Sequence, residues 1–138
     1  MGMYTEFHFN AELKENTPKT VINTLSHMVK GEDTDPLDHS LFKTSRWKSM
    51  LTCDSYYFAA DTHSTLRYDA SSRRYYLCIR CNLKNYDSEI EAFVDWIMPY
   101  VAGEDGDFLG FYRCEDTQVP MGIYLQKAMT YTLEQKEE

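Results

Sequence analysis

Two cysteines three residues apart, Cys78 and Cys81, are the pattern in this sequence closest to a chemical motif. A Cys-x-x-Cys pair in a turn or at a helix N-terminus can form a redox couple or half of a zinc site, for which Cys53 and Cys114 would be further ligands. This pair instead lies in an apolar run typical of a strand, where residues three apart point to opposite faces. We therefore expect free thiols, no metal and no cofactor.

The histidines do not form a recognisable motif either. No two of the four have the His-x-His or His-Glu-x-x-His spacing of a metal site. Glycine-rich nucleotide-binding loops and the Gly-x-Ser-x-Gly turn of hydrolases are also missing. A cysteine and a histidine brought together only by the fold would escape such a search. The sequence therefore identifies no catalytic residue. This favours a non-enzymatic protein, with an enzyme as the alternative.

Arginine and tyrosine recur on one side of the expected strands. If Leu77 and Ile79 face the core, Tyr76 and Arg80 face away from it, because successive strand residues alternate. The same alternation places Arg67 outward. Arginine stems also cover apolar sheet and pair with acidic residues across strands, so an ordinary solvated face is the alternative. Residues expected to bind a ligand or partner on this face are His8, Arg67, Tyr76, Arg80 and, if Leu109 and Phe111 point inward, Arg113.

The chain is strongly acidic. It has 14 Lys and Arg against 22 Asp and Glu, a formal net charge of −8. Such a surface repels phosphate backbones, so we expect no nucleic-acid partner. Acidic residues gather at 32–38 and 104–107, where they are typical of solvated loops. Alternatively, Glu104, Asp105 and Asp107 attract a basic protein partner.

Hydrophobic periodicity divides the chain into strands and two helices. Alternating apolar residues predict a strand over 6–13, and helical spacing predicts a helix over 18–30 that begins at Asn16-Thr17-Pro18. A second helix is expected to start at Ser88, in a capping box with Glu91, and to be distorted near Pro99. Further strands are expected over 55–60, 64–69, 74–83, 108–114 and 121–126, with a frayed tail after residue 128.

These elements predict one α+β domain over residues 1–138, because their order lacks the regular alternation of a doubly wound fold. We expect a two-layer sandwich in which an antiparallel or mixed sheet of about five to six strands carries both helices on one face, on a ferredoxin-like or cystatin-like plan. No apolar run is long enough to cross a membrane, and the N-terminus lacks the features of a signal peptide. A cytoplasmic protein without a membrane partner is expected.

Three stretches carry a resemblance to other proteins: Ser55-Tyr56-Tyr57-Phe58, the run from Tyr75 to Asp87, and Asp95-Trp96-Ile97. They resemble small bacterial or phage proteins to which no function is assigned. The resemblance covers most of the chain and implies a bacterial or phage origin. It implies no activity, cofactor or catalytic residue.

The function expected from these features is that of a non-enzymatic protein-binding module with an antitoxin-like, immunity-like or anti-defence role. Its tyrosines would supply contact area at a small entropic cost. The alternative is a small enzyme or ligand-binding domain, in which Arg67, Arg80, Arg113 and His8 line a pocket for an anionic small molecule. A homodimer formed through an exposed strand edge is the third alternative.

Overall fold

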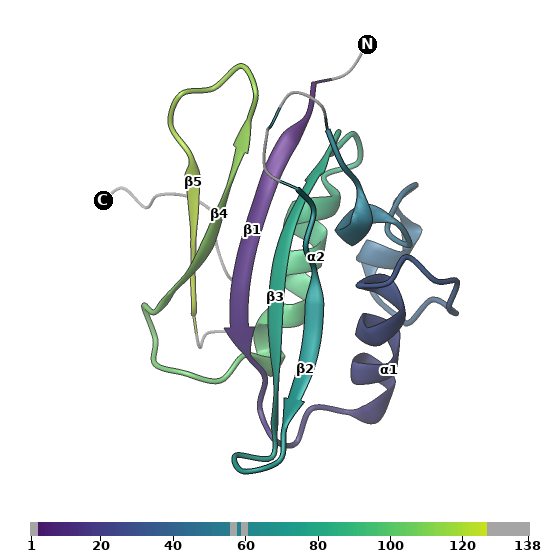
Figure 1. Cartoon of the computed structure of the whole chain (residues 1–138), viewed down its shortest axis with the longest axis vertical. Coiled ribbons are helices and arrows are strands. Elements are labelled where there is room, and N and C mark those ends of the chain that lie inside the picture. The colour runs from purple at the N-terminus through teal and green to yellow at the C-terminus, as the bar shows by residue number, and fades with distance from the viewer. Residues whose placement is uncertain (1–2, 56–57, 59–60, 127–138) are drawn as a thin grey trace.

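The computed structural model describes residues 3–55, 58 and 61–126. One antiparallel sheet of five strands packs against two α-helices (Figure 1), which confirms the α+β prediction. No helix among these residues is long and apolar enough to cross a membrane. The elements are β1 (Thr5–Glu12), α1 (Lys19–Met28), β2 (Thr65–Asp69), β3 (Arg74–Leu83), α2 (Glu89–Ile97), β4 (Phe108–Cys114) and β5 (Met121–Tyr124), with 3-10 turns at Ser40–Lys43, Met50–Thr52 and Met98–Tyr100.

The strands lie in the order β2-β3-β1-β4-β5, so the first strand of the chain is the central strand of the sheet. Phe7 of β1 lies opposite Cys81 of β3 on one side and Tyr112 of β4 on the other. The bounds of β3 and β4 are those predicted from the sequence, because both strands have clear turn residues before them.

The alternation of β1 separates the two faces of the sheet. Phe7 and Phe9 are fully buried on the side of the helices, as are Leu77 and Ile79 of β3, each 1% exposed. Glu6 and His8 point to the opposite side, where neither helix lies. In Figure 1 this side faces the viewer, with α2 behind β1 and β3 and α1 beside β2.

Helix α1 is shorter than expected. Its buried positions Val21, Leu25 and Met28 have the predicted helical spacing. Pro18, however, precedes the first helical residue as the cap, with an extended ψ of 144°, and no side chain caps the helix there. The helix is followed by Gly31, whose φ of +70° suits a residue without a side chain.

The start of α2 corrects the predicted capping box. Ser88 has a left-handed conformation, with φ at +58°, and its side chain makes no capping bond, because an N-cap residue normally needs extended backbone. Asn85 caps the helix instead: its Oδ1 accepts a hydrogen bond from the Ile90 amide at 2.8 Å, and its Nδ2 donates to Glu91 at 3.1 Å. The helix ends at Ile97 in a 3-10 turn that contains Pro99, as predicted.

Two 3-10 turns that the sequence did not predict close the helical layer. They lie in the segment that connects α1 to β2 along the chain and carry buried side chains, including Phe42, whose ring lies edge-on to Trp47 at 4.7 Å and to Trp96 of α2 at 5.2 Å. The strand expected over 55–60 falls largely outside the described residues, and Ser55 and Phe58 are not in a strand. The tail expected to be frayed after residue 128 also lies outside them.

Phe93 of α2 is predicted to be a stability centre of the domain. It is fully buried, and its ring lies edge-on to Phe7 at 6.0 Å and to Phe9 at 6.2 Å. We expect Phe93→Ala to lower the free energy of unfolding in urea by about 3–5 kcal/mol. Phe108→Ala, at a ring that is 61% exposed, is the control and should cost less than about 1 kcal/mol. Equal losses in the two variants would show that Phe93 is not a core residue.

Candidate functional site

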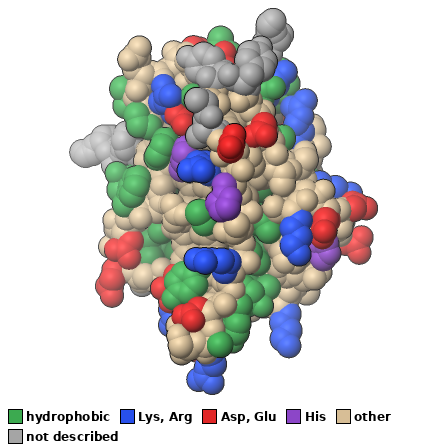
Figure 2. Space-filling view, viewed as in Figure 1, with side chains coloured by type: hydrophobic (Ala, Val, Ile, Leu, Met, Phe, Trp, Pro, Cys, Tyr) green, Lys and Arg blue, Asp and Glu red, His purple; other side chains and the backbone are tan. Residues whose placement is uncertain are grey.

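The side of the sheet opposite the helices is the candidate site, and it is named the open face below. Figure 2 shows histidine and basic side chains close together near its middle, with hydrophobic side chains to their left, over β4 and β5. The described side chains that form it are Glu6, His8, Asn10 and Glu12 of β1, Thr65, Arg67 and Asp69 of β2, Arg74, Tyr76, Cys78, Arg80 and Asn82 of β3, and Phe111 and Arg113 of β4.

Five residues predicted for binding lie on this face, and the pairing register brings them close together. His8 lies directly between Arg80 of β3 and Phe111 of β4. Arg67 lies opposite Tyr76, which is four residues before Arg80 in β3, with Cys78 between them on the same face. Residues directly opposite on one face of a sheet have Cβ atoms about 4.5–5.5 Å apart, so these side chains form a continuous surface. The predicted shared face of His8, Arg67, Tyr76 and Arg80 is confirmed, and Arg113 also lies on it.

The condition attached to Arg113 was wrong. Phe111 does not point inward: its ring stacks on His8 of the open face, with centroids 4.6 Å apart. Residues two apart in a strand share a face, so Phe111 and Arg113 must lie on the same side. The inward residue of β4 is Tyr112, opposite Phe7. Leu109 is buried as expected, beside a register shift between β4 and β5.

Glu6 connects two of the predicted residues. Its Oε2 accepts a hydrogen bond from Nε of Arg113 at 2.8 Å, and its Oε1 lies 3.2 Å from Nε2 of His8. The guanidinium of Arg113 also lies 5.3 Å from the centre of the buried Phe58 ring. The charge of Arg113 is therefore neutralised and covered within the chain. Arg113 stabilises the arrangement of the open face and is not a free cation for a ligand.

Arg67 and Arg80 differ from the other arginines of the open face. Arg74 pairs with Glu12 at 2.9 Å, but neither Arg67 nor Arg80 has a carboxylate within salt-bridge distance among the described residues. Arg80 donates from Nε to the backbone oxygen of Asp61 at 3.2 Å, and both arginines are exposed. Two cations on this face are thus available to a carboxylate or phosphate from outside.

His63 adds to this cationic region and was not predicted. Its amide donates to the backbone oxygen of Arg80 at 2.8 Å, two residues before the start of β2, so an exposed histidine lies beside Arg80. The position depends on how the segment before β2 returns to β3. The residues around His63 show no pattern from which that path could be predicted.

The predicted acidic residues form a separate surface. Glu104, Asp105 and Asp107 lie in the exposed turn before β4, at the opposite end of that strand from Arg113. Asp107 also has a structural role, because its Oδ2 accepts a hydrogen bond from the Glu104 amide at 2.9 Å. The turn is thus a charged loop whose shape Asp107 helps to hold.

The cysteine geometry agrees with the predicted opposite orientation of Cys78 and Cys81. Cys81 is buried beneath the sheet, whereas Cys78 is half-buried on the open face, and all four cysteines are free. Burial raises the pKa of Cys81 well above its usual value, and burial is also the main cause of the raised pKa of Cys53. Both thiols remain protonated at neutral pH, which makes them poor nucleophiles.

Glu89 is a buried carboxylate that sequence reasoning missed. It is fully buried in the first turn of α2, and its Oε1 accepts a hydrogen bond from the Asp87 amide at 3.1 Å. Its Oε2 has no hydrogen-bond partner among the described residues. A glutamate in the first turn of a helix is normally solvated and interacts favourably with the positive end of the helix dipole. The sequence therefore gives no indication that Glu89 is buried.

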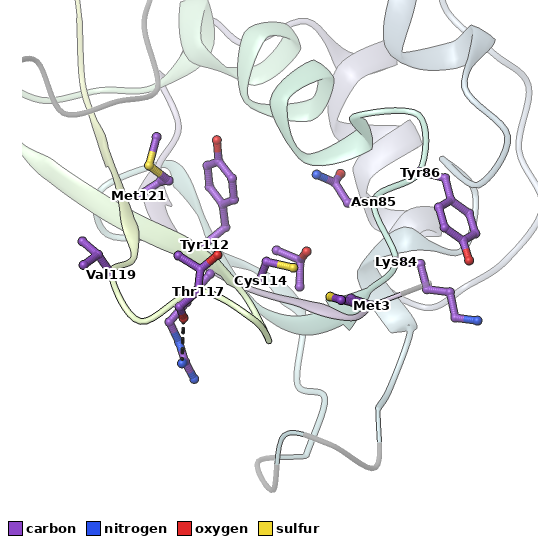
Figure 3. A pocket seen from close by; sticks show the side chains of 11 residues that line it. Met3, Lys84, Asn85, Tyr86, Tyr112, Cys114, Thr117, Val119 and Met121 are labelled. Atoms are coloured by element: carbon purple, nitrogen blue, oxygen red, sulfur yellow. Dashed lines mark hydrogen bonds between the residues drawn. The ribbon is translucent and has the colours of Figure 1, made fainter. Parts of the chain in front are cut away.

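A cavity of about 510 Å³ lies on the other side of the sheet, near the start of β1. Figure 3 shows Tyr112 and Met121 on one side of it and Lys84 and Tyr86 on the other. Asn85 lines it too, but its side-chain amide caps α2. Among the described residues, no group of three or more His, Cys, Asp or Glu side chains that could hold a metal ion lies in this cavity.

Comparison with protein-family models, with curated proteins and with solved structures found no match to this chain. The geometry is therefore the basis for inferring function.

The burial of Glu6 predicts that it contributes more to stability than its neighbour Glu12. The Glu6 side chain is 16% exposed and holds Arg113, whereas Glu12 is 37% exposed in its pair with Arg74. We expect Glu6→Gln to lower the free energy of unfolding by about 1.5–3 kcal/mol. Glu12→Gln should lower it by about 0–1 kcal/mol, as is usual for a solvated pair.

A double-mutant cycle checks the cause of this difference. Urea unfolding of Glu6→Gln in an Arg113→Gln background should show a smaller loss than in the wild type, because the shared interaction is already gone. An equal loss in both backgrounds would contradict the ion pair as the source of stability.

Proposed function

We propose that this chain is a non-enzymatic protein-binding module that holds a partner protein on its open face. An antitoxin-like, immunity-like or anti-defence protein of the bacterial or phage cytoplasm is the concrete version of this proposal. The observation that carries it is the row of Arg80, His8 and Phe111, with Arg67 and Tyr76 further along the same face, which neither helix covers.

The chemistry of this row is that of an interface. Arginine and tyrosine are enriched among the residues that dominate protein association, and phenylalanine is enriched at the centres of interfaces. The ring stack of His8 and Phe111 and the ion pair of Glu6 and Arg113 hold the face in one arrangement before a partner arrives. Preorganisation of this kind lowers the entropic cost of binding.

The charges of the face favour a particular contact. Arg67 and Arg80 have no carboxylate partner among the described residues, so the surface that meets them would carry carboxylates together with apolar side chains. A basic partner attracted by Glu104, Asp105 and Asp107 would meet a different surface, at the other end of β4. It is the second version of the same proposal.

We also infer that the fold plan is ferredoxin-like rather than cystatin-like, with β5 as an addition. The order strand, helix, two strands, helix, strand from β1 to β4 supports this plan. So does the split arrangement, in which β3 lies between β1 and β2, and β1 lies between β3 and β4. Such a plan leaves one sheet face free of helices, as the proposed binding mode requires.

The alternative function is that of a small enzyme or a ligand-binding domain for an anionic small molecule. The observation that favours it is the position of Arg80 between His8 and His63 on one exposed surface. A shift in melting temperature with inorganic phosphate, citrate or a nucleotide, lost in Arg80→Ala, would support it. A homodimer would appear in light scattering as twice the mass of the chain.

The protein-binding proposal is tested by capture from a bacterial lysate and a matched pair of variants. The immobilised wild type should retain a stoichiometric partner, identified by mass spectrometry, that Tyr76→Ala/Arg80→Ala loses, with the dissociation constant raised about 100-fold or more. Tyr86→Ala/Arg46→Ala removes the same residue types from a pair outside the open face, made of the exposed Tyr86 and the half-buried Arg46, whose guanidinium lies 4.9 Å from the ring centre.

This control should retain the partner within about threefold of the wild-type affinity, as expected for exposed residues outside an interface. If both double variants lose the partner equally, or if the open-face variant retains it, the open face is not the binding surface.

A further inference from the structure

The outer edge of β2, at one end of the sheet, is exposed to another chain. This strand is the last of the sheet, and its outer edge pairs with no strand among the residues that the structure describes. β2 contains no proline, lysine or bulge, which are common protections of an exposed edge. Its charged residues Arg67 and Asp69 both point to the open face. The backbone of β2 is therefore an available template for another extended chain.

A groove of about 850 Å³ runs between this edge and α1. Its apolar surface consists of Ile22 of α1, Leu66 and Tyr68 of β2, and Tyr75 of β3. Tyr68 is 53% exposed, and its ring centre lies 4.9 Å from that of Tyr75. An exposed strand edge beside a helix, with an apolar groove between them, is suited to binding a peptide as an added strand.

The charges around the groove are opposite to those of the whole chain. Lys14, Lys19 and Arg73 line it together with a single carboxylate, that of Glu15, although the chain has a net charge of −8. Arg73 lies 3.4 Å from Glu15, but its side chain is 71% exposed, so the pair is weak and Arg73 can contact an incoming carboxylate. Charge complementarity therefore favours an acidic occupant.

We propose that this groove binds an extended acidic peptide segment of another protein. The segment adds to the outer edge of β2 through backbone hydrogen bonds. Alternate apolar side chains contact Leu66 and Tyr68, while its carboxylates lie near Lys19 and Arg73. The site is distinct from the open face, because Leu66 and Tyr68 point to the side of the helices.

A displayed library of random 12-residue peptides, selected on the immobilised full chain, tests the proposal. Enriched peptides should carry acidic residues together with apolar residues at alternate positions. One such synthetic peptide is then titrated by fluorescence anisotropy. Lys19→Glu/Arg73→Glu should raise its dissociation constant tenfold or more, which corresponds to about 1.4 kcal/mol. Lys30→Glu/Lys43→Glu, with the same change in net charge at two exposed lysines outside the groove, is the control and should change it less than about twofold.

Strand addition is tested on the peptide itself. Methylation of alternate backbone nitrogens removes the donors that pair with β2 and should abolish binding, while the same peptide without methyl groups binds. Tyr76→Ala/Arg80→Ala on the open face should leave peptide binding unchanged, so failure of this proposal is distinguishable from failure of the proposed function.

Several results would overturn the proposal. Enrichment of basic or uncharged peptides, or of none, would remove the acidic occupant, and equal binding of the methylated peptide would remove strand addition. If light scattering shows a dimer that Tyr68→Ala dissociates, a second copy of the chain is the occupant instead.

Discussion

The central position of β1 is the constraint on which the rest of the structure depends. Phe7 and Phe9 bury their rings against Phe93, and the strand is hydrogen-bonded on both edges, to β3 and to β4. Because side chains alternate, this burial also determines that Glu6 and His8 lie on the open face. A register slip of one residue would bury those polar groups and expose the aromatic ones, at a cost that a domain of this size cannot bear.

The central position of β1 also determines which side chains lie next to one another on the open face. His8 is fixed between Arg80 and Phe111, and Glu6 neutralises Arg113, so some charges of the open face pair with one another and stabilise its structure. The two cations without a carboxylate partner among the described residues, Arg67 and Arg80, belong to β2 and β3. The same two strands border the edge of the sheet with the groove beside α1. One half of the sheet therefore offers two different surfaces, one on each side of β2.

Much of the fold could be predicted from the sequence, because it follows from local periodicity. The alternation of apolar residues defined β3 and β4, and placed Tyr76 and Arg80 on the correct face. Predictions failed where a contact between distant segments decides the outcome. Asn85 caps α2 through a turn that the Ser88 pattern does not report.

The remaining parts of the site depend on long-range packing. Glu89 is buried although it lies in the first turn of a helix, and the position of Phe58 over Arg113 depends on the path of the chain between α1 and β2, which carries no periodic signal. Arg113 reached the predicted face, but Phe111, two residues before it in β4, had been assigned to the opposite one. The two-residue period links Phe111 to the outward Arg113, so the stack with His8 follows from Arg113, whereas the buried Leu109 departs from that period beside the register shift in β4.

Hydroxyl-radical footprinting of the chain, alone and with the partner it captures, tests the binding face most directly. If the open face is the interface, Tyr76 and Phe111 should react with hydroxyl radicals in the free chain and become protected in the complex. The exposed Tyr86 should react equally in both. Unchanged reactivity of Tyr76 and Phe111 in the complex, or protection of Tyr86 alone, would contradict it.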